Sequence, residues 1–115
     1  MIRTLAALLV FVAGISPALA QQSAAGVDAH LSKGTQLMHD QMFEAAANEF
    51  KQALALNPSD PRVHFQYAIC LMSLGNNQEA RREFEQVRKL AGGSRYLTYY
   101  LGRLDLLSND YASAI

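Results

Sequence analysis

The chain has 115 residues, of which 50% are hydrophobic and 17% are charged. That length allows one small domain, and the apolar content excludes a disordered chain. Ten basic and ten acidic side chains cancel to a net charge of zero with no run of Lys or Arg, so the basic surface that nucleic-acid binding needs is missing.

Residues 1–20 have the features of a secretory signal peptide. A single positive charge precedes the apolar segment 5–15, and small residues then lead to Ala20. A membrane-spanning helix would need roughly 20 apolar residues. We therefore expect cleavage between Ala20 and Gln21 and a periplasmic or secreted mature protein, with retention as a membrane anchor as the alternative.

The residues around this site are expected to separate the leader from the domain. Pro17 is expected to end the apolar helix. Residues 21–26, QQSAAG, are small and polar and predict a flexible lead-in.

The rest of the chain repeats with a period of 34 residues. Gly34 coincides at this shift with Ala68 and Gly102. Further positions match in size or aromatic character, namely Leu37 with Leu71, Phe50 with Phe84, Ala46 with Ala80 and Ala114, and His30 with His64. Within each period the apolar residues recur at steps of three and four, which predicts amphipathic helices, and no segment alternates as a strand would.

Polar breaks divide this pattern into pairs of helices. They fall at residues 39–41, 75–77 and 108–110. A further break at residues 57–61 separates the first pair from the second, with Asp60 predicted as the N-cap and Pro61 as the first helical residue.

This pattern resembles the tetratricopeptide repeat (TPR) family, whose motif is W-x2-L-G-x2-Y, then A-x3-F, then P. The matching residues are His30, Gly34, Leu37, Ala46, Phe50 and Pro58 in the first repeat, and His64, Ala68, Leu71, Ala80 and Phe84 in the second. The chain departs from the motif in having no Trp and in placing Asp105 at an aromatic position.

The resemblance implies an all-α fold, a right-handed superhelix (solenoid) of antiparallel helix pairs. About two and a half TPR repeats would follow the signal peptide. They are predicted at residues 27–60, at residues 61–94 and, incomplete, at residues 95–115.

The resemblance also implies a binding groove for a peptide or partner protein on the concave face, which the first helix of each pair forms. The implied lining residues are Leu31, Thr35, Met38, Phe65, Ile69, Met72, Tyr96, Tyr99, Tyr100 and Arg103. Aromatic, Met and Arg side chains are enriched at interfaces. The alternative is that several of them are core, Ile69 and Tyr99 above all. Chaperone-binding relatives clamp a carboxylate with Lys and Asn where this chain has Leu31 and Thr35, so that clamp is not expected.

No catalytic, cofactor or metal site is expected. His30 and His64 occupy the Trp position of the motif and are expected to pack, while His39 lies at a helix end, where a basic side chain suits the dipole. No two histidines have metal-ligand spacing. Cys70 is predicted to be a small buried hydrophobic residue, and residues 81–89 the solvated face of a helix.

Together these features predict a non-enzymatic interaction module, a periplasmic scaffold or assembly factor that binds protein rather than nucleic acid. It would have no stable membrane insertion after signal cleavage. The alternative is the N-terminal TPR segment of a longer exported protein, whose C-terminal outer-membrane barrel or enzyme carries the main activity.

The incomplete third pair carries its own expectation. A short second helix would begin near Tyr111, too short to be stable alone. Four leucines of the preceding helix would then be partly uncovered, namely Leu97, Leu101, Leu104 and Leu107. Self-association through this repeat is the expected consequence.

Overall fold

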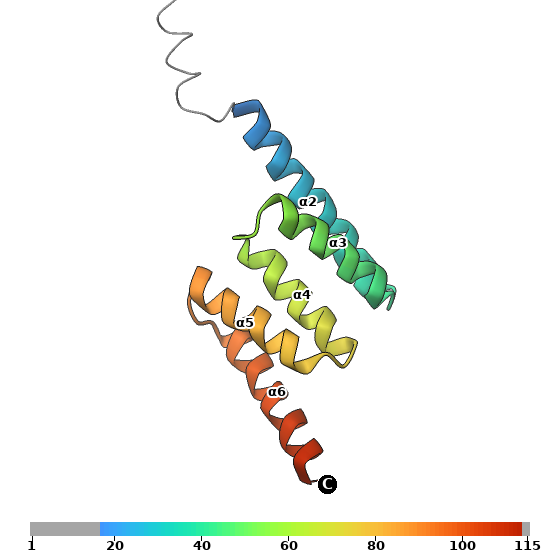
Figure 1. Ribbon diagram of the computed structural model, residues 1–115, viewed down its shortest axis with the longest axis vertical. Coiled ribbons are helices and arrows are strands. Elements are labelled where there is room, and N and C mark those ends of the chain that lie inside the picture. The colour runs from blue at the N-terminus through green and yellow to red at the C-terminus, as the bar shows by residue number, and fades with distance from the viewer. Residues whose placement is uncertain (1–16, 114–115) are drawn as a thin grey trace, which may run out of the picture.

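The computed structural model describes residues 17–113, with side chains described as far as Ser108. Within this range the chain is entirely helical, and the helices follow in the order α2 (Pro17–His39), α3 (Phe43–Leu56), α4 (Pro61–Ser73), α5 (Asn77–Ala91) and α6 (Arg95–Ser113). Each helix packs against its neighbour in the chain, and α2 also contacts α4 (Figure 1). The predicted all-α solenoid of TPR helix pairs is confirmed. Almost all of the predicted signal peptide lies outside the described residues.

The two turns within helix pairs have the same construction 34 residues apart. Gln41 and Gly75 both have positive φ, at 61° and 83°. The next backbone N–H in each turn, that of Met42 or Asn76, donates to a carbonyl five residues earlier at 2.8 Å. A residue in the left-handed conformation, followed by a backbone hydrogen bond that spans five residues, ends a helix and reverses the chain. The two predicted breaks at residues 39–41 and 75–77 therefore form equivalent turns.

The connection from α3 to α4 is capped as the sequence predicts. The Asp60 side chain accepts a hydrogen bond from the backbone N–H of Arg62 at 3.0 Å, and Pro61 is the first residue of α4. Asp60 is 7% exposed, and the Arg62 guanidinium lies 2.7 Å from its second carboxylate oxygen. The same guanidinium reaches Asp28 on α2 at 2.9 Å. One arginine thus ties the cap of α4 to the first helix.

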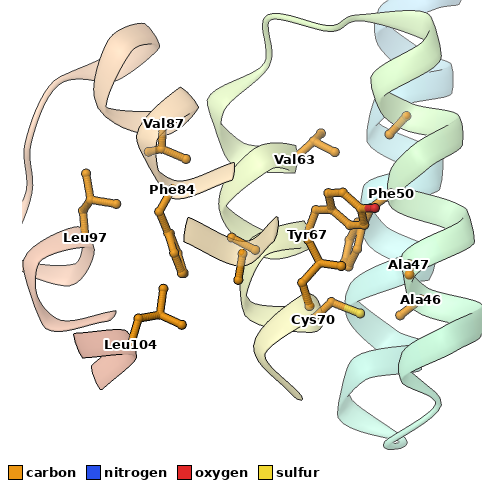
Figure 2. Close-up of a cluster of buried hydrophobic side chains, with 14 of the residues drawn as sticks. Ala46, Ala47, Phe50, Val63, Tyr67, Cys70, Phe84, Val87, Leu97 and Leu104 are labelled. Carbon is orange, nitrogen blue, oxygen red and sulfur yellow. The ribbon is translucent and has the colours of Figure 1, made fainter. Parts of the chain in front are cut away.

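Two fully buried phenylalanines organise the core. Phe50 of α3 and Phe84 of α5 have 0% exposure and occupy equivalent positions of the two repeats (Figure 2). A Cβ built on Gly34 would lie 2.5 Å from Cε1 of Phe50. The small residue at this position is therefore required for the approach of α3 to α2, as the motif implies.

The N-terminal part of α2 differs from the expectation. The predicted end of the apolar helix at Pro17 borders residues outside the described range, but residues 21–26 are helical instead of forming a flexible lead-in. The reason is packing against the end of α3. A Cβ at Gly26 would meet the Leu56 side chain at 2.8 Å, and the Ser23 hydroxyl donates to the Leu56 carbonyl at 3.3 Å.

The C-terminal helix also differs. The predicted break at residues 108–110 does not form, because α6 continues to Ser113, and a second helix starting near Tyr111 is absent from the described part of the chain. The segment contains no Gly or Pro, the residues that interrupt helices most strongly. None of the described helices is both long and apolar enough to span a membrane.

The leucines of α6 are better covered than expected. Leu97, Leu101 and Leu104 are buried, with exposures of 1%, 8% and 1%, and only Leu107 is exposed, at 42%. Leu97 and Leu104 point toward the side of α5 that carries Phe84 (Figure 2). This helix therefore docks on α5 with its leucine face, and the expected uncovered stripe is wrong for three of the four leucines.

Candidate functional site

The predicted groove residues all belong to α2, α4 and α6, which we call the inner helices. Their side chains form rows of equivalent positions at the 34-residue shift, one with Leu31, Phe65 and Tyr99, another with Thr35, Ile69 and Arg103. We call the surface made by these rows the inner face.

The structure divides the predicted residues into two groups by exposure. Thr35, Tyr96, Tyr99 and Arg103 are exposed, Tyr96 by 73% and Tyr99 by 57%. The others are half-buried and pack against the core, namely Leu31, Met38, Phe65, Ile69, Met72 and Tyr100. Ile69 and Tyr99 are the two groove residues for which a core position is the main alternative. Ile69 does pack against the core, whereas Tyr99 lies on the surface.

An aromatic cluster connects α4, α5 and α6. The Phe65 ring meets Phe84 at 5.7 Å and Tyr100 at 5.5 Å, both edge to face, and Phe84 stacks on Tyr100 at 5.6 Å between centroids. Such pairs add about 0.5–1.5 kcal/mol each beyond their buried area. Because Phe84 is fully buried, Phe65 and Tyr100 stabilise the stack of helices in addition to facing the groove.

The cluster continues onto the surface along α6. Tyr99 contacts Tyr100 edge to face at 5.2 Å, and the guanidinium carbon of Arg103 lies 5.9 Å from the centre of the Tyr99 ring. This distance fits a cation–π contact. The exposed Tyr99 and Arg103 are therefore held in place by a chain of rings that ends in the core.

A hollow of about 520 Å³ opens on the inner face between α2 and α4. It is lined by Leu31, Thr35, Pro61, Arg62, Phe65, Gln66 and Ala91. Its volume falls in the range of roughly 300–1,000 Å³ that is typical of ligand pockets. Three of the predicted groove residues, one polar and two apolar, are thus brought together around one pocket.

Sequence reasoning missed several residues of this face. Arg62 and Gln66 line the pocket, and Leu106, 64% exposed, follows Arg103 along α6. The signal for Leu106 was present, because it is equivalent at the 34-residue shift to Met38 and Met72. Arg62 and Gln66 carried the same signal, because they are equivalent at the 34-residue shift to the predicted groove residues Tyr96 and Tyr100.

The charges on this face are unevenly paired. Arg62 is engaged by Asp60 and Asp28, and this contact holds the pKa of the Asp60 carboxyl below its ordinary value. Arg103 forms no ion pair with any residue that the structure describes, and the sequence has no carboxylate three or four residues from it on α6. Arg103 is therefore a cation of the inner face that no carboxylate in the described range engages.

A second hollow, of about 620 Å³, lies beyond the groove, where the first turns of α2 meet the connection between α3 and α4. Leu19, Val27 and Leu56 supply its apolar wall. Its charged wall is the ion pair of Asp28 and Arg62. The lining charges Asp28, Asp60 and Arg62 are all paired with one another, so none of these three is left unpaired for a ligand.

The histidines at the Trp position form a repeated pair with a glutamate of the second helix. Nδ1 of His30 lies 2.6 Å from Oε2 of Glu49, and Nδ1 of His64 lies 2.5 Å from Oε2 of Glu83. His64 is 8% exposed, and its Nε2 lies 2.6 Å from the Pro58 carbonyl oxygen. The expected packing role is therefore accompanied by a polar link between helices, which sequence reasoning missed.

The remaining candidate groups show no reactive arrangement. Cys70 is fully buried, its thiol donates to the Phe43 carbonyl at 3.0 Å, and burial raises the pKa of the thiol. Nothing in the described range brings together three His, Cys, Asp or Glu side chains that could hold a metal ion.

Comparison with known proteins agrees with this architecture. The family model described as tetratricopeptide repeat matches residues 37–98, more than half of the chain. Two uncharacterized TPR repeat-containing proteins of Arabidopsis thaliana are each 40% identical over 57 residues, which cover 50% of this chain and 7% of theirs. The chain thus matches only a small part of these curated relatives. With its helix pairs, its repeated turns and this match, the chain belongs to the tetratricopeptide repeat family.

Proposed function

We propose that the chain is a non-enzymatic protein–protein interaction module that binds a peptide or partner protein on its inner face. TPR repeats form modules of this kind. The observation that carries the proposal is the exposed row on α6, in which Tyr96, Tyr99, Arg103 and Leu106 follow one another at helical spacing. Exposed aromatic, aliphatic and Arg side chains on one face are the composition of interface centres.

The test replaces the exposed tyrosines and leaves the buried cluster intact. Phe65 and Tyr100 are unsuitable, because both contact buried Phe84 and their loss would disturb folding as well as binding. In the double variant Tyr96→Ser/Tyr99→Ser we expect unchanged helical circular dichroism and at least tenfold weaker binding of peptides selected from a phage-displayed random library.

The matched control is Met42→Ser, which removes an apolar side chain of 54% exposure at the turn between α2 and α3. It should leave peptide binding unchanged. Equal binding by the tyrosine double variant and the wild-type chain would show that the inner face of α6 is not the binding surface.

For location, we propose export to the periplasm or secretion, with removal of residues 1–20. The support is the order of the N-terminal residues, a positive charge, a short apolar segment and small residues before Ala20. Cell fractionation followed by N-terminal sequencing tests this proposal. A mature chain that begins at Gln21 supports it, and a chain that retains Met1 in the membrane fraction favours the anchored alternative.

The second candidate function is that these repeats are the N-terminal interaction segment of a longer exported protein. Its main activity would then reside elsewhere, in an outer-membrane barrel or an enzyme. The relatives support this candidate, because the matched segment is only 7% of their length. The reading frame downstream of codon 115 distinguishes the two candidates.

Self-association through the third repeat remains a prediction, but the exposed apolar surface that would drive it is smaller than the sequence predicts. Only Leu106 and Leu107 are exposed among the α6 leucines, since the others pack on the preceding helices. Sedimentation of the chain across a range of concentrations tests whether this remaining apolar surface joins two copies.

A further inference from the structure

On the inner face, a row of contacting aromatic rings connects the pocket between α2 and α4 to the guanidinium of Arg103. The pocket between α2 and α4 includes Phe65, whose ring contacts Tyr100 at 5.5 Å. Tyr100 contacts Tyr99 at 5.2 Å, and the Arg103 guanidinium carbon lies 5.9 Å from the Tyr99 ring. A ligand that lies along these side chains would therefore meet an apolar hollow at one end and a positive charge at the other.

Arg103 is positioned for recognition by the side chains beneath it. Its neighbour Tyr99 is supported by Tyr100, and Tyr100 stacks on the fully buried ring of Phe84 at 5.6 Å. A side chain held in this way loses less conformational freedom when it binds than a free surface arginine would. The planar guanidinium can then form paired hydrogen bonds with a carboxylate.

The charge of the face favours an anionic partner group. The inner helices carry two acidic residues whose side chains are described, Asp28 and Asp105. Asp28, on α2, is already paired with Arg62. Asp105, on the same helix as Arg103, is paired with Arg81 of α5 at 2.5 Å. No acidic residue of the chain therefore competes for Arg103 within the described range, and an acidic ligand would meet an uncompensated positive charge.

From these observations we propose that the inner face selects peptide segments that combine a large apolar side chain with an Asp or Glu. The apolar side chain would enter the pocket beside Leu31 and Phe65, and the carboxylate would pair with Arg103. This inference rests on the proposed function and adds the chemical class of the partner.

The experiment selects peptides from a phage-displayed random library on the full chain and compares the recovered sequences between variants. The wild-type chain should enrich peptides with a large apolar residue and an acidic residue at a constant separation. Arg103→Gln should remove the acidic preference and weaken an enriched synthetic peptide about tenfold, which is the effect of losing one charge-assisted hydrogen bond. Arg103→Glu should reverse the preference to Lys or Arg.

The matched control is Arg82→Gln, which removes an exposed arginine of α5 away from the inner helices and should leave the selection unchanged. Enriched peptides without an acidic preference, or the same preference in Arg103→Glu, would overturn this inference and leave the proposed function standing. Failure to enrich any peptide, or binding unaffected by Tyr96→Ser/Tyr99→Ser, would overturn the proposed function itself.

Two further arms separate other occupants. A synthetic peptide with phosphoserine in place of the acidic residue should bind no more tightly than the carboxylate peptide, and binding only by the phosphopeptide would overturn the carboxylate assignment. Sedimentation of the chain without peptide should give the same result for the wild-type chain and Tyr96→Ser/Tyr99→Ser, and a dimer that this double variant dissociates would identify a second copy as the occupant instead.

Discussion

Adding one methyl group at equivalent positions of two repeats should have opposite effects on stability. Gly34 and Gly102 are 68 residues apart, which is two repeat periods, and both lie within inner helices, Gly34 in α2 and Gly102 in α6. A Cβ at Gly34 would meet three atoms of the Phe50 ring, the nearest at 2.5 Å. A Cβ at Gly102 would meet nothing within 4 Å.

The sizes of the two effects follow from helix propensity and packing. Replacing Gly by Ala within a helix gains about 1 kcal/mol in either position. At Gly34 that gain is opposed by overpacking, typically about 1–3 kcal/mol. Because Phe50 has 0% exposure and its ring is enclosed by the core, we take the upper end of that range. Gly34→Ala should therefore lower the free energy of unfolding by about 2 kcal/mol, and Gly102→Ala should raise it by about 1 kcal/mol.

Urea or thermal unfolding followed by circular dichroism measures both variants against the wild-type chain. For a domain of this size, about 1 kcal/mol corresponds to a shift of roughly 4–8 °C in Tm. The double variant should be close to the sum of the two effects, since the sites are far apart in the stack. Stabilisation by Gly34→Ala would refute the close approach of α3 to α2, and destabilisation by Gly102→Ala would show that this surface of α6 is covered.

Three further outcomes test other parts of the fold. Gln41→Gly should raise the free energy of unfolding by about 1 kcal/mol in urea titrations, because Gln41 has a φ of 61° that glycine adopts without strain, as Gly75 does in the equivalent turn. His64→Phe should lower the free energy of unfolding by about 1 kcal/mol, since it leaves two part-buried acceptors unpaired, and an unchanged urea midpoint would contradict that link. His30 and Lys33 hydrogen-bond to Glu49 and hold the pKa of its carboxyl below the ordinary value of 4.5. The stability that the ionised Glu49 contributes is therefore present above that ordinary pKa and is lost as the pH falls through the lowered pKa. In Glu49→Gln, the urea midpoint should fall less steeply on acidification than in the wild-type chain.

The repeat register and the helix boundaries within it could be predicted because each depends on a local signal. The turn after α2 and the turn after α4 follow from polar breaks at the 34-residue shift, and the start of α4 follows from the Asp60 cap. The small residue at Gly34 is a steric requirement that a motif records directly. Signals of this kind involve residues close in sequence or in one helix pair.

The ends of the helical stack could not be predicted in the same way, because they depend on contacts made after folding. Residues 21–26 have little apolar pattern of their own, yet Gly26 allows the helix to lie against Leu56, 30 residues away. The continuation of α6 through residues 108–110 is a second case, where a polar break that resembles the earlier ones remains helical. In both places the local sequence permits helix or turn, and tertiary packing decides.

The exposure of a groove residue likewise depends on its place in the stack and not only on its place in the repeat. Leu31, Phe65 and Tyr99 are equivalent by register, but the first two are half-buried and Tyr99 is 57% exposed. Packing of α4 beside α2 and of Tyr100 against Phe65 explains this difference, because each inner helix covers part of the one before it. A motif assigns the same role to all three residues. The large side chains of the inner face with the most exposed area are those of α6, and for this reason the experiments on binding concentrate on Tyr96, Tyr99 and Arg103.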